Sequence, residues 1–333
     1  MKNRAKARSR RELLTAVGFL MPNFLGFLVF AAGPVLFSLA VSFSNWNLQR
    51  TVPFRWTLLD NYIMLFKDRE FWMYFFNTAY LMLGLPLAIA GSLFLAILLN
   101  QKIKGAIAYR AFFYLPCVTS GVALMILWKA LYNPDFGPIN AALNWLLNNL
   151  GINALIQRLG AGALTPPHWL LSTKNLLGLS VEEIRLSAGQ WGLGARDAII
   201  IMGIWAAIGG NNLILYLAAL SNVPQELYEA AEIDGAGTWA SFKNVTWPQL
   251  APATFFIIVM SFIGGLQGGF EQARVMTLGG PAGTTTTLTY YIYVKAFEEF
   301  QIGYASAVSW VLFMIIFAIT LVNWKFGTKE LNY

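Results

Sequence analysis

The residue types that carry most enzyme chemistry are scarce in this chain of 333 residues. His168 is its only histidine and Cys117 its only cysteine, which excludes histidine-based catalytic triads, disulfides within the chain and most zinc sites. Residues 279–284 are rich in glycine but lack the lysine of a phosphate-binding loop. We therefore predict that the chain is not an enzyme and that it has no catalytic residues, no metal site and no cofactor of its own.

One short segment, residues 224–237, concentrates acidic side chains between two apolar stretches. Pro224 suits the first position of a helix, Glu226 lies where the helix dipole favours a carboxylate, and Gly235 suits the helix end. The predicted helix of about three turns is too short to be stable alone in water. We therefore expect it to bind a partner protein, and its carboxylates favour a basic surface on that partner.

Polar groups inside apolar segments form a second candidate site, since they are costly there unless they line a cavity or bond to one another. Asn211 and Asn212 follow a glycine pair, and Gln267 is separated by another glycine pair from Phe270 and Glu271. Amide and carboxylate groups beside an aromatic ring can hold a sugar. The alternative is helix packing, because glycines let helices approach closely and asparagine can form hydrogen bonds between helices.

The composition indicates the elements that position these residues. The chain is 57% hydrophobic and 12% charged, whereas a soluble domain carries about 25% charged residues. So few charges cannot cover a soluble surface, and the many apolar and aromatic residues exclude disorder. We predict an all-α integral membrane protein. A membrane-spanning helix needs about 20 apolar residues, and six windows satisfy this within a membrane domain of residues 13–324: residues 13–43, 71–99, 109–132, 198–220, 252–270 and 303–324.

The basic residues predict how the chain is oriented in the membrane. Six of the 23 Lys and Arg residues lie in the N-terminal segment 1–12, and Lys102, Lys104 and Arg110 lie around the second connection. Loops rich in Lys and Arg stay in the cytoplasm and attract lipid headgroups. We therefore predict cytoplasmic termini, a cytoplasmic tail 325–333, a cytoplasmic loop 221–250 and no binding of nucleic acid. Residues 133–197 form an outer segment whose leucine-rich patches predict short helices on the membrane surface.

The acidic segment resembles the EAA loop of bacterial ABC importer permeases. That family pattern is Glu-Ala-Ala, three residues, Gly, nine residues and then Ile-x-Leu-Pro. Trp247 stands here where the pattern has leucine, and the other motif positions follow its spacing: Glu229, Ala230, Ala231, Gly235, Val245 and Pro248. The resemblance implies six transmembrane helices of the type I ABC importer permease fold, with the EAA motif coupling to an ATPase subunit. It implies that Glu229 contacts a basic ATPase residue and that Gly235 allows close backbone approach.

Over roughly residues 60–325 the chain is similar to the carbohydrate-type permeases, above all to the first permease subunit of maltose transporters. Matching segments include residues 77–78, 137–140, 277–281 and 303–307. The resemblance implies a bacterial inner-membrane importer with four kinds of partner: membrane lipid, a distinct second permease subunit, two ATP-binding cassette subunits that bind ATP and Mg, and an external solute-binding protein. It also implies a sugar pathway along the fourth and fifth spans that includes Ser261.

Two alternatives remain open. A permease for another solute delivered by a binding protein, such as a glycerol phosphate ester, would need Lys or Arg in its pathway, and the fourth and sixth spans contain neither. A membrane enzyme with six spans would need a cluster of His, Asp or Glu at membrane depth, and only Glu271 is a serious candidate. We therefore expect a transport subunit specific for an oligosaccharide, a glycoside or a polyol.

Overall fold

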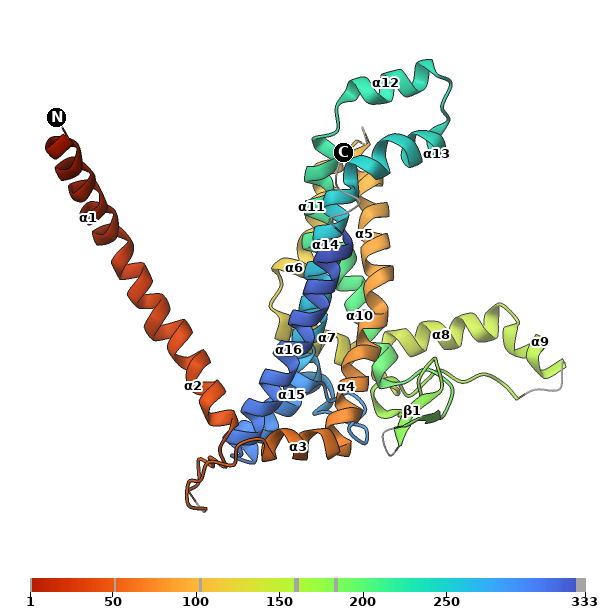
Figure 1. The fold of residues 1–333 in the computed structure, drawn as a ribbon. Coiled ribbons are helices and arrows are strands. Elements are labelled where there is room, and N and C mark those ends of the chain that lie inside the picture. Colours follow the sequence, from red (N-terminus) through yellow and green to blue (C-terminus); the bar gives the residue numbers. More distant parts are fainter. Residues whose placement is uncertain (1, 51, 102–103, 159–161, 183–184, 328–333) are drawn as a thin grey trace. The chain divides into compact units, whose positions relative to one another are not determined.

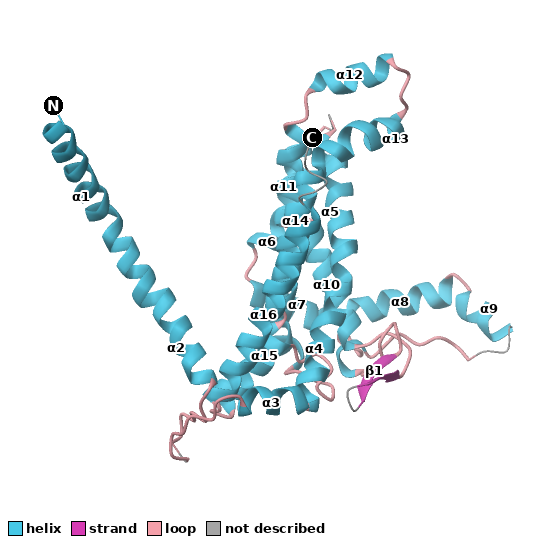
Figure 2. Cartoon of the chain, viewed as in Figure 1, coloured by secondary structure: helices cyan, strands magenta, loops and turns pink. Residues whose placement is uncertain are grey.

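The computed structural model describes residues 2–50, 52–101, 104–158, 162–182 and 185–327. Lys102 and the end of the predicted tail, residues 328–333, lie outside the described residues. Helices dominate these segments (Figure 2). The chain forms two compact units, Met1–Lys67 with Ile292–Val311 and Asp68–Tyr291 with Leu312–Tyr333.

The first unit begins with a long apolar helix. This helix consists of α1 (Lys2–Phe27), the π-helical turn η1 (Leu28–Ala32) and α2 (Gly33–Ser42), and Thr15–Ser42 is apolar enough to span a membrane. Pro34 lies in the first turn of α2, directly after the π-helical turn, where its missing N–H is tolerated. The unit also contains α3 (Asp60–Lys67), the π-helical turn η6 (Val294–Glu298) and the start of α16 (Ile302–Gly327).

Three helical segments in the second unit and α16 carry the remaining long apolar runs. They are α4 (Arg69–Leu81), η2 (Met82–Gly84) and α5 (Leu85–Asn100); α10 (Ala195–Ile208) and α11 (Asn211–Ser221); and α13 (Thr238–Ser241), η4 (Phe242–Thr246) and α14 (Trp247–Gln267). Leu95, Leu213, Tyr216, Leu250 and Ile257 are buried together and join α5, α11 and α14. Many other apolar side chains on these helices are exposed, as expected of a surface that faces lipid.

The predicted third span, residues 109–132, is not one continuous helix. Its residues form α6 (Ala106–Val118) and α7 (Gly121–Leu131), which are bent by 96°. Pro116 removes a backbone donor near the end of α6, and Thr119 is extended while Ser120 is also non-helical, so the helix does not continue. In the described residues, five helices are long and apolar enough to cross a membrane, or six spans if this bent pair is counted as one.

Residues 133–197, predicted as the outer segment, and the connection that follows α14 contain short elements. The outer segment has α8 (Pro138–Asn149), α9 (Ile152–Arg158), the 3-10 turn η3 (Trp169–Leu171) and the antiparallel strands β1 (Leu179–Glu182) and β2 (Arg185–Ala188). These two strands are a small departure from the expected all-α fold. The later connection contains the π-helical turn η5 (Gln272–Thr277) and α15 (Leu288–Tyr293). The acidic segment forms α12 (Gln225–Ile233).

Candidate functional site

A cavity of about 270 Å³ lies within the second unit, between α4, η2, α5, α10 and α14. Aliphatic side chains and glycines form most of its wall. The polar groups that line it are three hydroxyls and two amides, from Thr78, Ser261, Thr287, Asn212 and Gln272. None of the lining residues is charged. The cavity therefore offers neutral hydrogen-bond donors and acceptors in an apolar setting.

The six predicted pathway residues divide between this cavity and other surroundings. Asn212 and Ser261 line the cavity. Asn211 instead accepts a hydrogen bond from the Cys117 thiol, with 3.3 Å between Sγ and Oδ1. The remaining three are not among the lining residues: Gln267 and Glu271 are exposed, and Phe270 packs edge-on against Tyr290, with 6.0 Å between ring centroids.

Two of the glycines beside these residues allow neighbouring segments of the chain to pack closely, because a side chain at either position would clash. A Cβ on Gly209 would lie 1.9 Å from the carbonyl oxygen of Phe113, so this glycine allows α6 to contact the end of α10. Gly269 has a φ of +86°, and a Cβ there would lie 2.4 Å from the Thr287 methyl carbon. Packing therefore explains Gly209, whereas Gly269 brings Thr287 to the cavity wall.

Three of the polar lining residues were not predicted from the sequence: Thr78, Gln272 and Thr287. Thr78 lies in the apolar run of the second span, and Gln272 and Thr287 lie beyond the predicted end of the fifth. The run of four threonines at residues 284–287 is the one local pattern that could have drawn attention to this connection. All four are buried.

A hydrogen-bonded cluster fixes the connection that carries Thr287. The fully buried Asn77 donates to the carbonyl oxygens of Gly283 at 2.8 Å and Thr286 at 2.9 Å. Arg196, which is 4% exposed, donates from Nε to Asn77 Oδ1 at 3.0 Å and to the Thr284 carbonyl at 2.9 Å. We call these five residues the roof cluster. They tie the threonine run to α4 and to the start of α10, next to the cavity.

Asp197 compensates the buried charge of Arg196 and extends the network. The Tyr80 hydroxyl donates to Asp197 Oδ1 at 2.7 Å, and the backbone N–H groups of Leu176 and Gly194 donate to Oδ2. The Arg196 guanidinium also lies 5.7 Å from the centroid of the Tyr80 ring, a cation–π distance. Hydrogen bonds lower the cost of burying a charge, and both the Arg196 guanidinium and the Asp197 carboxylate are hydrogen-bonded.

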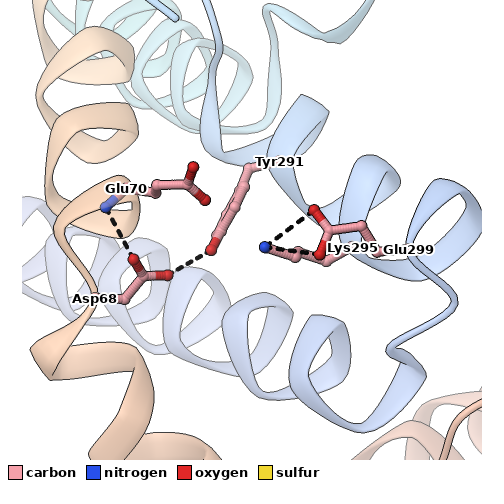
Figure 3. Close-up of polar contacts among 5 residues, drawn as sticks. All are labelled: Asp68, Glu70, Tyr291, Lys295 and Glu299. Atoms are coloured by element: carbon pink, nitrogen blue, oxygen red, sulfur yellow. Dashed lines mark hydrogen bonds and ion pairs between the residues drawn. The ribbon is translucent and has the colours of Figure 1, made fainter.

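Two further polar contacts lie near the ends of outer elements (Figure 3). In the second unit, Asp68 accepts a hydrogen bond from the Tyr291 hydroxyl and caps α4 through the Glu70 backbone N–H. In the first unit, Lys295 and Glu299 form an ion pair at 2.8 Å, four residues apart. Both contacts stabilise helix ends, and none of their residues is among the residues that line the cavity.

The predicted acidic helix is present as α12, at one end of α5, α11 and α14 (Figure 1). Pro224 is its N-cap rather than its first helical residue. At its other end Gly235 has a φ of +74°, and the Gly235 and Ala236 N–H groups bond to the Glu232 and Ala231 carbonyls. This pattern is a Schellman C-cap, in which glycine is favoured by its backbone conformation. A Cβ there would meet nothing within 4 Å.

The motif residues on α12 are largely uncovered. Glu229 and Ala230 are exposed and Ala231 is half-buried. Within the described chain, Glu229 forms no hydrogen bond or ion pair. Pro248 lies in the first turn of α14, where a missing N–H is tolerated. The polar side-chain link from α12 to the helices below is one contact, between the Tyr228 hydroxyl and Thr246 Oγ1 at 3.0 Å.

Comparisons with known proteins give one consistent family. The family model described as "Binding-protein-dependent transport system inner membrane component" matches residues 73–324. The probable ABC transporter permease protein YesP of Bacillus subtilis is 33% identical over 98% of this chain and 95% of its own length. The lactose transport system permease protein LacF of Rhizobium radiobacter is 32% identical over 92% of this chain and 91% of its own.

A solved structure has a similar fold. It is a chain of a bacterial ABC transporter involved in the import of the acidic polysaccharide alginate, with a TM-score of 0.74. The likeness covers 98% of this chain and 99% of the other, at 23% sequence identity. At that identity the likeness concerns the fold.

Proposed function

The chain belongs to the family of binding-protein-dependent transport system inner membrane components, and we propose that it forms half of the translocation pathway for a sugar, meaning an oligosaccharide, a glycoside or a polyol. As an ABC transporter permease it is a transport protein of the inner membrane and not an enzyme. The open questions concern its solute and its contacts with the other subunits.

The neutral polar lining of the cavity is the observation that supports a sugar. The Ser261 hydroxyl and the amides of Asn212 and Gln272 can exchange hydrogen bonds with sugar hydroxyls. The hydroxyls of Thr78 and Thr287 are already hydrogen-bonded within the protein, so they contribute polarity to the wall rather than free donors. Two relatives carry names that agree with this: LacF, and the multiple sugar-binding transport system permease protein MsmF of Streptococcus mutans, which is 30% identical over 93% of this chain. Asn212 and Ser261 are therefore the best supported of the predicted pathway residues.

A glycerol phosphate ester is the second candidate solute. The sn-glycerol-3-phosphate transport system permease protein UgpA of Yersinia pestis is 28% identical over 83% of this chain. A phosphate ester, however, needs a cation or several backbone N–H groups to replace its water. The cavity lining supplies no Lys or Arg, so a neutral solute fits it better.

The partners follow from the family and from the exposed surface of α12. We expect a distinct second permease to complete the pathway, an external solute-binding protein to deliver the solute, and two ATP-binding cassette subunits to bind ATP and Mg. The uncovered Glu229, Ala230 and Ala231 suit docking in a groove of one ATPase subunit, with Gly235 and Pro248 fixing the ends of the loop. We therefore propose that α12 and both termini lie in the cytoplasm.

Uptake by the reconstituted transporter tests the solute class. Proteoliposomes that contain the full complex and its binding protein are supplied with neutral oligosaccharides, polyols and sn-glycerol 3-phosphate. We expect ATP-dependent uptake of a neutral solute and a raised apparent KM for it in Ser261→Ala and Asn212→Ala. Uptake of the phosphate ester alone would overturn the proposal.

A further inference from the structure

The outer segment contains an uncharged stretch that leaves the bundle directly after α7. No residue from 136 to 157 is charged, although the stretch includes α8 and most of α9. Large apolar side chains on it are exposed: Trp145 by 61%, Leu150 by 64% and Leu155 by 60%. Such a surface would be unusual on a segment that only faces water.

One end of α8 is anchored firmly to the membrane helices. The Trp169 indole donates to Asn140 Oδ1 at 2.7 Å, and Asn140 is 5% exposed. Ile139 and Leu143 pack against the buried cluster that contains Trp128 of α7 and Met202 of α10, as well as Trp169. The position of α8 at this end is therefore set by the same core that holds the ends of α7 and α10.

The apolar face of α8 is packed against the core at its start, but no residue in the described chain covers the second half of this face. Ile139, Leu143, Leu146 and Leu150 follow a spacing of three and four residues, which places them on one face of the helix. The first two are half-buried against the core, whereas Leu146 and Leu150 are exposed by 39% and 64%. The opposite side carries amides, including those of the exposed Asn144 and Asn148. The helix is therefore amphipathic without any charge.

The direction of α8 agrees with a position along a membrane surface. In Figure 1 it runs across the direction of α5 and α14, and β1 lies farther from α12 than α8 does. The core that anchors α8 borders exposed apolar residues of a span, because Trp205 stacks edge-on with Trp128 at 5.5 Å and is 47% exposed. The anchored end of α8 therefore lies next to an exposed apolar residue of a long apolar helix, at the level where such a helix ends.

We propose that α8 and the start of α9 lie in the bilayer interface of the leaflet remote from α12, with Leu146 and Leu150 facing the acyl chains. Amphipathic helices of this kind bury their apolar face at the boundary of headgroups and acyl chains. Indole and amide groups are favoured at the level of the lipid headgroups, where the side chains of Trp145, Asn144 and Asn148 would then lie. The outer segment would then hold the lipid-facing rim of the permease at a fixed depth.

Site-directed spin labelling tests the position of α8. In the complete transporter with Cys117→Ser, single cysteines replace Leu146 or Leu150, with Asn144 or Asn148 as matched controls on the other side of the same helix. Each nitroxide is measured in lipid nanodiscs for its collision rates with oxygen, which concentrates in lipid, and with a water-soluble nickel chelate.

We expect Leu146→Cys and Leu150→Cys labels to favour oxygen over the nickel chelate several-fold more than the two asparagine positions do. Equal preference for the nickel chelate at all four positions would overturn the proposal. Protection of the leucine positions only after solute-loaded binding protein is added would overturn it as well, because α8 would then be a protein-docking surface. Neither outcome depends on which solute is transported.

Discussion

Asn77→Ala separates the structural role of the roof cluster from its effect on the cavity. The change removes donors from the Gly283 and Thr286 carbonyls and an acceptor from Arg196. Gly283 keeps a hydrogen bond from the Thr286 N–H, and Arg196 Nε keeps the Thr284 carbonyl. One buried carbonyl therefore loses its side-chain donor outright, and two further hydrogen bonds disappear. At about 1–3 kcal/mol for an unpaired buried group and about 1 kcal/mol for each of the other two bonds, we expect the free energy of unfolding to fall by about 3–5 kcal/mol.

Asn61→Ala is the matched control for this change. Asn61 is also buried and also donates twice to backbone carbonyls, those of Ser42 and Ser44, at 2.8 Å each. It belongs to the first unit and not to the cavity wall. Both variants should lower the thermal stability of the purified complex by similar amounts. Only Asn77→Ala should also raise the apparent KM for solute, because it releases the connection that carries Thr287.

The assay is ATP-dependent uptake across a range of solute concentrations, together with a thermal unfolding curve for each variant. Equal effects of the two substitutions on the apparent KM would show that the roof cluster only stabilises the fold. An unchanged unfolding temperature in Asn77→Ala would refute the hydrogen-bond argument itself.

The remaining predictions concern coupling and the pathway. Glu229→Lys should abolish uptake and release the ATPase subunits on purification, since it sets like charges against each other in the docking groove; a basic-to-acidic change on the ATPase should restore part of both. Tyr228→Phe and Thr246→Val should each lower the ratio of solute transported to ATP hydrolysed, with no further loss in the double variant. Ser261→Ala should raise the apparent KM by about 5- to 10-fold, the equivalent of one hydrogen bond, whereas Gln267→Ala should change it less.

Each of these predictions has a control at a nearby position. Glu232→Lys makes the same charge change on α12 outside the motif, so equal loss of ATPase subunits in both variants would point to net charge alone. Thr238→Val alters a residue that lines the same small cavity as Tyr228 but forms no hydrogen bond with it, and it should leave the transport ratio normal. If Gln267→Ala has the larger effect on KM, the cavity is not the solute site.

Local patterns in the sequence predicted the elements well. Apolar windows of about 20 residues indicated the long helices. Gly235 marked the end of α12, because a helix end of this kind depends on the left-handed backbone conformation of one glycine and not on contacts with distant residues. The bend between α6 and α7 was missed, although Pro116 lies directly before it. The reason is that proline within membrane helices is often tolerated, so the residue alone does not distinguish a kink from a break.

The candidate site could be predicted only in part, because its contacts join distant residues. Asn77 and the carbonyl oxygens to which it donates are more than 200 positions apart, and Arg196 lies 119 positions from Asn77. No local spacing reveals such contacts. Arg196 also precedes the predicted fourth span, where a basic residue is expected to extend toward the headgroups. In the structure it turns inward and is 4% exposed.

The helix α14 connects the two candidate sites, and their coupling can be measured. At one end it follows the turn that holds Thr246, and farther along it carries Ser261 in the cavity wall. At 1.5 Å per residue these two positions are about 22 Å apart. Substitutions at that distance normally have additive effects. The opposite wall is tied by the roof cluster, so we infer that a displacement of α12 reaches the cavity mainly through α14. A non-additive effect of Tyr228→Phe and Ser261→Ala on transport would support this route, and strict additivity would exclude it.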